Sequence, residues 1–318
     1  MARGSEGRLL IGEETTWGTQ ATSFQILYFV REGLQGEIEN IVDETISSRR
    51  AMETPRGGRI TAGGGIDVNL SNVGAHCTLI KHALGNVTTT QELDAGGNPT
   101  GFYIHEITGA DSLPAGLTIE KGFTDTGIYF VYTGGKINSM TIECTNDGLV
   151  TGSFDVMAKD EQSSNTSVSA TPTDNGHRAF VYWEGEIQID GAVAGKISSY
   201  SITVDNQLSD EFFIGDRYRG IIVEGRRQVT GSLQAYFEDL TLYNKFRNET
   251  ALSLLLRITY DADNYIEIYT PNVKLTGRGS PVIDSAGVVY QNFDWQAFYD
   301  TTLGSDVKIT IKNTLSAV

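Results

Sequence analysis

The stretch Val150-Thr-Gly-Ser-Phe-Asp-Val-Met157 decides the fold class, because Val150, Phe154 and Val156 stand two or four residues apart with polar residues between them. This period of two is typical of a β-strand that buries one face. Similar runs, rich in Val, Ile, Thr and Tyr and separated by Gly, Asn or Asp, recur along the chain and predict a mainly β protein of antiparallel sandwiches or barrels. The predicted strands are residues 37–42, 65–70, 102–107, 127–132, 136–143, 150–157, 181–189, 196–204, 228–237, 251–260, 265–270, 288–299 and 307–311.

Two segments have the apolar spacing of short helices. The first extends from Ser71 or Asn72 to Leu84; either polar residue can cap its first amides, and Gly85 can end it. The second covers residues 239–247. We expect each helix to cover an open face of a sheet.

Length, glycine content and charge limit the class of protein further. A chain of 318 residues suggests two domains, and 36 glycines against 6 prolines suit many tight turns. The net charge of −16 argues against a protein that grips DNA or anionic lipid, because phosphate binding needs clustered Lys and Arg. Two cysteines cannot form a disulfide framework.

One pattern occurs twice: strand, long polar loop, strand, helix. It covers residues 37–84 and again 198–247, and it predicts two tandem modules, each with one short flanking α-helix. Local similarity accompanies it, since residues 135–142 resemble 195–202 and residues 150–154 resemble 229–233. The predicted division is an N-terminal arm (1–33), a first module (34–160), a linker or surface loop (161–180) and a second module (181–318).

Recognisable catalytic or metal-binding motifs are missing from the sequence. His76 and His82 fall on different faces of the first helix, and Cys77 and Cys144 lie among apolar neighbours. No G-x-S-x-G elbow or phosphate-binding loop occurs. We therefore expect no enzyme activity and no cofactor. The N-terminal apolar run is too short for an export signal, so we expect synthesis in a cytoplasm and no membrane association.

The N-terminal stretch Ile11-Gly-Glu-Glu-Thr-Thr-Trp-Gly-Thr19 resembles the opening arm of the tail tube proteins (major tail proteins) of long-tailed bacteriophages. The polar loop before Gly57-Gly-Arg-Ile-Thr-Ala-Gly-Gly-Gly65, the strand after it and a helix ending at Gly85 are also similar to that family. The resemblance implies β-sandwich modules whose sheets join around a channel, in rings of six modules that stack into a conduit for DNA ejection. Two modules in each chain would then give a ring of three chains.

The family also implies partners and a location. They are other copies of this chain, a tape-measure protein and a tail terminator, with genomic DNA passing through the lumen without specific binding. The location is the tail of the virion, after synthesis in the host cytoplasm. An acidic lumen would repel phosphate, although acidic surfaces also simply keep proteins soluble.

The two long loops, residues 43–59 and 205–227, are predicted to make the contacts between stacked rings. Each mixes arginines with carboxylates and has few large apolar residues to pack within the chain, although both are also compatible with solvated hairpins. The candidate loop residues are Arg49, Arg50, Arg56, Arg59, Asp210, Glu211, Asp216, Arg217, Arg219, Arg226 and Arg227, and those of the arm are Glu13, Glu14 and Trp17.

Two other functions fit a β-rich chain. One is a β-sandwich adhesin or carbohydrate-binding module, or another virion component such as a decoration or baseplate protein. Such an adhesin should cluster its aromatic residues, whereas Trp17, Trp183 and Trp295 are scattered in the sequence. The other is a hydrolase on a β scaffold, which the missing catalytic motifs disfavour.

Overall fold

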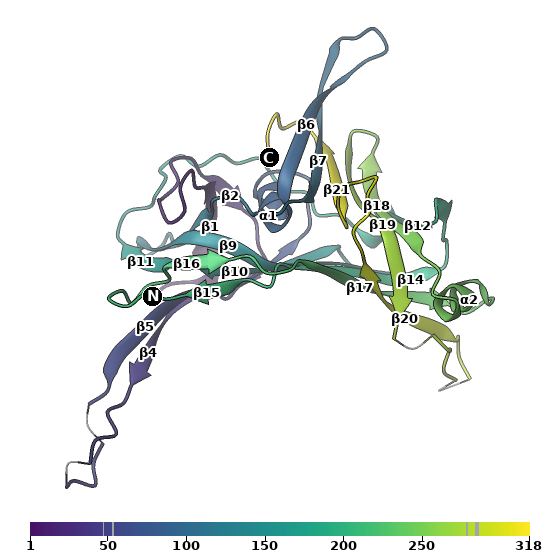
Figure 1. Cartoon of the computed structure of the whole chain (residues 1–318). Coiled ribbons are helices and arrows are strands. Elements are labelled where there is room, and N and C mark those ends of the chain that lie inside the picture. Colours follow the sequence, from purple (N-terminus) through teal and green to yellow (C-terminus); the bar gives the residue numbers. More distant parts are fainter. Residues whose placement is uncertain (47, 53, 278, 284–285) are drawn as a thin grey trace.

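The computed structural model describes residues 1–46, 48–52, 54–277, 279–283 and 286–318. It confirms a mainly β protein, with one curved central sheet that carries the other elements on one side (Figure 1). The first half of the chain contains, in order, η1 (Gly4–Glu6), β1 (Gly7–Glu13), β2 (Gln25–Leu27), β3 (Arg31–Glu32), β4 (Gln35–Ile41), β5 (Arg56–Asn69), α1 (Ala75–Leu84), β6 (Gly85–Leu93), β7 (Pro99–Gly109), β8 (Leu117–Phe123), β9 (Ile128–Thr145), β10 (Thr151–Ala158) and β11 (Asp160–Ser164).

The second half continues the same sheet. Its elements are η2 (Tyr182–Glu184), β12 (Gly185–Ile189), β13 (Ala192–Val193), β14 (Ile197–Asp205), β15 (Ser209–Glu211), β16 (Ile221–Val223), β17 (Gln228–Tyr236), α2 (Thr241–Arg247), β18 (Leu252–Asp261), β19 (Asn264–Thr276), β20 (Tyr290–Ala297) and β21 (Lys308–Asn313).

The central sheet has the antiparallel order β4–β5–β10–β9–β14–β17–β20–β19, with β3 beside the far end of β5. Its middle pair, β9 and β14, joins the two halves of the chain, and Ile142 lies opposite Ile202. The similar sequences 135–142 and 195–202 therefore belong to strands that pair with each other. Their likeness does not mark equivalent positions in two modules.

Strand β9 connects the central sheet to an outer sheet. The sequence predicts two strands here, residues 127–132 and 136–143, but the chain forms one strand that bends between them. Gly134 has a φ of +67° at the bend, which a glycine adopts without a steric penalty. The first part of β9 pairs with β8 and β11, and β8 continues through β1 to β2.

A second outer sheet has the order β6–β7–β21–β19–β18–β12–β13. The hairpin β6–β7 comes from the first half of the chain, yet residues 103–108 of β7 pair with β21 from the C-terminal end. This hairpin rises above the body in Figure 1. It ties the two halves together independently of the central sheet.

One buried cluster extends through both halves. It includes Phe154 and Ile142 of the first half and Tyr200, Phe293 and Trp295 of the second, all at most 1% exposed. The halves therefore share a core, and they are expected to unfold together.

Both predicted helices are present, with shorter bounds. Helix α1 begins at Ala75, and its N-cap is Gly74 without a side-chain hydrogen bond, so the predicted capping by Ser71 or Asn72 is wrong. Asn72 instead donates a hydrogen bond to the carbonyl oxygen of Lys312 at 2.8 Å. Gly85 does end α1, with a φ of +107°. Helix α2 lies at the edge of the sheet and rests its Phe246 ring on Phe293.

Residues 161–180, for which the sequence predicts a linker or surface loop, lie against the first half. The beginning of this segment forms β11. Further on, the buried carboxylate of Glu120 accepts hydrogen bonds from the Val168 amide and the Ser167 hydroxyl, and Phe180 is fully buried. Phe180 also contacts the ring of Tyr260 in the second half, with 6.1 Å between the ring centroids, so the segment is packed as part of the fold over much of its length.

Candidate functional site: a polar sheet face and two long loops

The open face of the central sheet is polar. Side chains alternate along each strand, so Phe154, Ile142 and Tyr200 point into the core while their neighbours point to solvent. Cross-strand pairing brings these outward residues into rows. The polar ones are Thr151, Ser153 and Asp155 of β10, Ser139, Thr141, Glu143 and Thr145 of β9, Ser199, Ser201, Thr203 and Asp205 of β14, Gln228, Thr230, Ser232 and Gln234 of β17, and Asn292, Asp294 and Gln296 of β20. Met157, Tyr236 and Tyr290 are larger outward residues toward the ends of their strands.

Side chains in these rows hydrogen-bond to each other across the strands. The hydroxyls of Thr141 and Thr203 are 2.9 Å apart, across the boundary between the two halves. Those of Ser201 and Ser232 are 2.8 Å apart. Such cross-strand pairs hold these side chains in place.

Positive charge is absent from the middle of this face. Strands β10, β14, β17 and β20 and residues 137–145 of β9 contain no Lys or Arg. At one edge, Arg31 binds Asp67 at 2.7 Å. The hydrogen bond from Ser153, together with Arg31, lowers the pKa of Asp67 below its usual range, so this carboxylate stays ionised. The face is therefore uncharged or acidic across these middle strands, while Lys136, which pairs with Glu224, and Lys274 lie on β9 and β19 outside this region.

The first long loop projects away from the body as the tip of the β4–β5 hairpin (Figure 1). All seven residues of β4 are exposed. Arg49 and Arg50 lie in the loop, but Arg56 and Arg59 belong to β5, which begins at Arg56, so the predicted loop bound of 59 and strand start of 65 are wrong. Arg59 stacks on the Phe212 ring of the second loop with 4.7 Å to its centroid.

The second long loop, in contrast, docks on the first half of the chain. It contains the β15–β16 ribbon, whose Ile222 is 2% exposed. Arg219 is also buried; it donates hydrogen bonds to the carbonyl oxygens of Ala62 and Ala158, each at 2.5 Å, and to Asp210 at 2.7 Å.

Two more arginines of this loop bind within the chain. Arg217 donates to the carbonyl oxygen of Gly58 at 2.8 Å, and Arg227 pairs with Asp306 at 2.9 Å. Asp216 accepts a hydrogen bond from the Tyr218 amide. Glu211 and Arg226 are exposed. The expectation that this loop has few residues to pack within the chain is therefore wrong, because the loop contacts β5 and β10. A role in ring stacking stays a prediction for its exposed tip.

The candidate residues of the N-terminal arm also make contacts within the chain. Burial opposes ionisation of Glu13, but hydrogen bonds from His82 and Lys81 lower its pKa to about 2. The buried Glu14 carboxylate accepts hydrogen bonds from the amides of Gly18 and Gly134.

Trp17 belongs to the same local structure. Its indole N–H donates to the carbonyl oxygen of Gly134 at 2.9 Å, and the Lys159 ammonium lies over its ring. Glu13, Glu14 and Trp17 therefore fix the turn that follows β1, a strand that is itself part of the first outer sheet.

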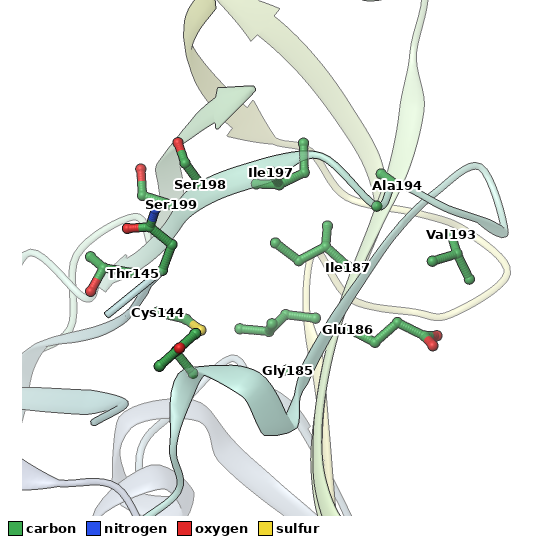
Figure 2. Close-up of a pocket in the computed structure, with 14 residues that line it drawn as sticks. Cys144, Thr145, Gly185, Glu186, Ile187, Val193, Ala194, Ile197, Ser198 and Ser199 are labelled. Carbon is green, nitrogen blue, oxygen red and sulfur yellow. The ribbon is translucent and has the colours of Figure 1, made fainter. Parts of the chain in front are cut away.

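The structure adds a feature that the sequence analysis missed, a hollow of about 300 Å³ between β9, β12 and the β13–β14 connection. Figure 2 shows Cys144, Ile187 and Ile197 around it. Tyr182, Val193, Ala194 and Leu256 also line it, and Tyr182 and the next residue in the sequence, Trp183, are both exposed. The adjacent aromatic residues Tyr182 and Trp183 were the available sequence signal.

In the part of the chain that the structure describes, no helix has the length and apolar character needed to cross a membrane. A search of curated proteins found no match. The model of the phage tail tube protein family matches residues 4–297 of the 318 residues. The polar face, the projecting hairpin and this match lead to one conclusion: the chain belongs to the phage tail tube protein family and is a structural protein of the virion tail.

Proposed function

We propose that three copies of this chain form a ring of six tube modules, and that the rings stack into a hollow conduit for DNA ejection. The observation that carries the proposal is the β9–β14 pairing, which joins two similar sets of strands edge to edge inside one chain. The same edge-to-edge strand pairing that joins the two halves can also join neighbouring chains.

The two sets of strands have the same order of pairing. In the first half the order is β5–β10–β9–β8, and in the second it is β17–β20–β19–β18. Phe154 lies opposite Ile66 in the first set, and Phe293 lies opposite Leu233 in the second. A helix follows β5 and another follows β17. This correspondence supports two modules, with β6–β7 as an addition to the first.

The central sheet ends in two strand edges. On one side, among the described residues, β3 and β4 pair only with β5, and on the other Lys274–Thr276 of β19 pair with β20. Within the chain, β14 holds the position equivalent to β3 and β4, and it pairs with β9, the equivalent of β19. Joining β3 and β4 of one copy to β19 of the next repeats that contact and covers both edges, and a ring closes it.

In such a ring, we place the polar face of the central sheet toward the channel. Duplex DNA is held by Lys and Arg that neutralise phosphates, and this face offers Ser, Thr and carboxylates in their place. A wall of this kind lets DNA slide.

The β4–β5 loop is the element we assign to ring stacking, with Arg49, Arg50 and Arg56 among its contacts. A tape-measure protein in the lumen and a terminator at the tube's end are the further partners expected for a tail tube. The outer sheets and the β6–β7 hairpin lie on the opposite side from the polar face and form the exterior of the tube (Figure 1).

Native mass spectrometry of rings released from assembled tubes tests the ring size. Each chain has a mass of 34.6 kDa, and the proposal expects a trimer. A hexamer would show that the second half does not act as a tube module.

A further inference from the structure

The apolar hollow lies at one end of the central sheet. It is bounded by Cys144 and Thr145, where β9 ends, and by Ile197, where β14 begins (Figure 2). Val193, which lines it, is 62% exposed, and Trp183, which follows the lining residue Tyr182 in the sequence, is 68% exposed. Apolar surface gathered in this way on a soluble chain marks a contact site.

The β4–β5 loop lies at the other end of the same sheet. Strand β14 begins beside the hollow at Ile197 and ends at Asp205. The antiparallel pairing of β14 with β9, of β9 with β10 and of β10 with β5 places Arg56, where β5 begins beside the loop, at the same end of the sheet as Asp205. The loop tip exposes Ile46 at 96% and Met52 at 79%. Chains stacked head to tail along the strands therefore bring an apolar tip toward an apolar hollow.

Charge also fits this pairing. Residues 42–59 contain four arginines (49, 50, 56 and 59) and three carboxylates (43, 44 and 53). The neighbourhood of the hollow exposes Asp147 and Glu186, and Figure 2 shows the Glu186 side chain directed away from the hollow, toward solvent. Arg50 of the loop and Arg56 at the start of β5 are exposed and can meet these carboxylates.

The second loop fits the hollow less well. Its tip also exposes apolar residues, Phe213 and Ile214. However, residues 205–227 contain five carboxylates (205, 210, 211, 216 and 224) against four arginines (217, 219, 226 and 227), and Arg217, Arg219 and Arg227 are bound within the chain. An acidic tip facing an acidic rim is disfavoured.

We propose that the hollow is the receptor for the β4–β5 loop of a second copy of this chain in the adjacent ring, with Ile46 and Met52 seated against Tyr182, Trp183 and Val193. The inference rests on the proposed stacking of rings and names the surface that receives the loop. The contact is heterologous, so it repeats without limit along the tube axis.

Engineered disulfides test the proposal in assembled tubes. The variant Met52→Cys/Trp183→Cys is oxidised after assembly and is expected to give a ladder of covalently linked chains on a non-reducing gel. The matched variant Ile214→Cys/Trp183→Cys, which places a cysteine on the other loop, is expected to stay monomeric on the gel, as is each single variant.

The outcomes separate the inference from the function on which it rests. Intact tubes without a Met52–Trp183 ladder, or a ladder only from the Ile214 variant, overturn the assignment of this receptor while leaving the tube intact. A wild-type chain that forms no tubes overturns the proposed function, and the inference falls with it.

A second variant does not depend on disulfide geometry. Val193→Asp places a charge on the rim and is expected to shorten the tubes at least several-fold, whereas Leu93→Asp, at a similarly exposed site on the β6–β7 hairpin, is expected to leave their length unchanged. Equal lengths for the two variants contradict the proposal.

Discussion

Replacing Arg219 by Met should release the second long loop from the first half of the chain. The methionine retains an unbranched apolar stem but removes three hydrogen bonds, two to the carbonyl oxygens of Ala62 and Ala158 and one to Asp210. Hydrogen bonds of a charged group contribute about 1.5–3 kcal/mol each, so the three sum to roughly 4.5–9 kcal/mol at most. The Asp210 side chain is 30% exposed and can be rehydrated, which reduces this figure. Removing one partner of a buried pair costs about 3–5 kcal/mol, and we expect a loss in that range.

Urea unfolding of the unassembled Arg219→Met chain measures this loss, and hydrogen exchange of the amides of residues 209–223 locates it. Arg50→Met is the matched control, because Arg50 is exposed on the first loop. A free energy of unfolding within about 0.5 kcal/mol of the control, together with unchanged exchange in β15 and β16, would refute the claim that Arg219 holds the loop in place.

Three further predictions follow from the sheet and its core. Burial lowers the pKa of His76 from 6.5 to about 4, so as the pH falls the unfolded chain takes up a proton at this imidazole before the folded chain does. This group alone should lower the free energy of unfolding by roughly 3 kcal/mol between pH 6.5 and pH 4. Because burial also lowers the pKa of His82, His105 and His177, the decline should become shallower in His76→Gln without disappearing, and an equally steep decline in that variant would contradict the assignment. A Cβ at Gly231 would lie 2.1 Å from the Ser201 carbonyl oxygen and 2.3 Å from the Trp295 ring, so Gly231→Ala should lower the free energy of unfolding by about 1–3 kcal/mol or more. The control Gly195→Ala meets no atom within 4 Å and should be nearly neutral, and equal melting temperatures for the two variants would contradict this packing. The double variant Ser201→Lys/Ser232→Lys loses one hydrogen bond, which contributes about 1 kcal/mol. Its tubes should retain duplex DNA at low salt, whereas tubes of the matched variant Ser201→Gln/Ser232→Gln should not. If DNA passes through both kinds of tube alike, these residues do not face the channel.

The long strands of the central sheet were predictable because burial there follows sequence parity closely, whereas β1 and β8 of the first outer sheet, which have runs of consecutive buried residues, and β6 were missed. In β14, for example, Tyr200, Ile202 and Val204 are buried and Ser199, Ser201 and Thr203 are not. The strand–loop–strand–helix pattern also predicted the order of β5 and α1 and of β17 and α2.

The connections between sheets were harder to predict. Nothing in residues 128–145 indicates that one strand serves two sheets, since the bend depends on tertiary pairing on both sides of Gly134. The pairing of β7 with β21 joins residues about 200 positions apart, and a local pattern contains no information about such a partner.

The candidate site likewise has one part that the sequence predicts and one part that depends on tertiary contacts. The polar composition of the loops was visible, but the commitment of Arg219 and Arg227 to partners within the chain depends on carbonyl groups of Ala62, Ala158 and Ala110, which carry no sequence signal. The hollow beside Trp183 likewise arises only when β9, β12 and β14 come together.

A cryo-electron microscopy reconstruction of the assembled tube tests the central claim most directly. The account predicts three chains in each ring, with β9 and β14 of every chain joined as they are here, and with Thr141, Ser201 and Ser232 facing the channel. A ring of six chains, or a channel lined by the outer sheets with these residues turned away, would contradict it.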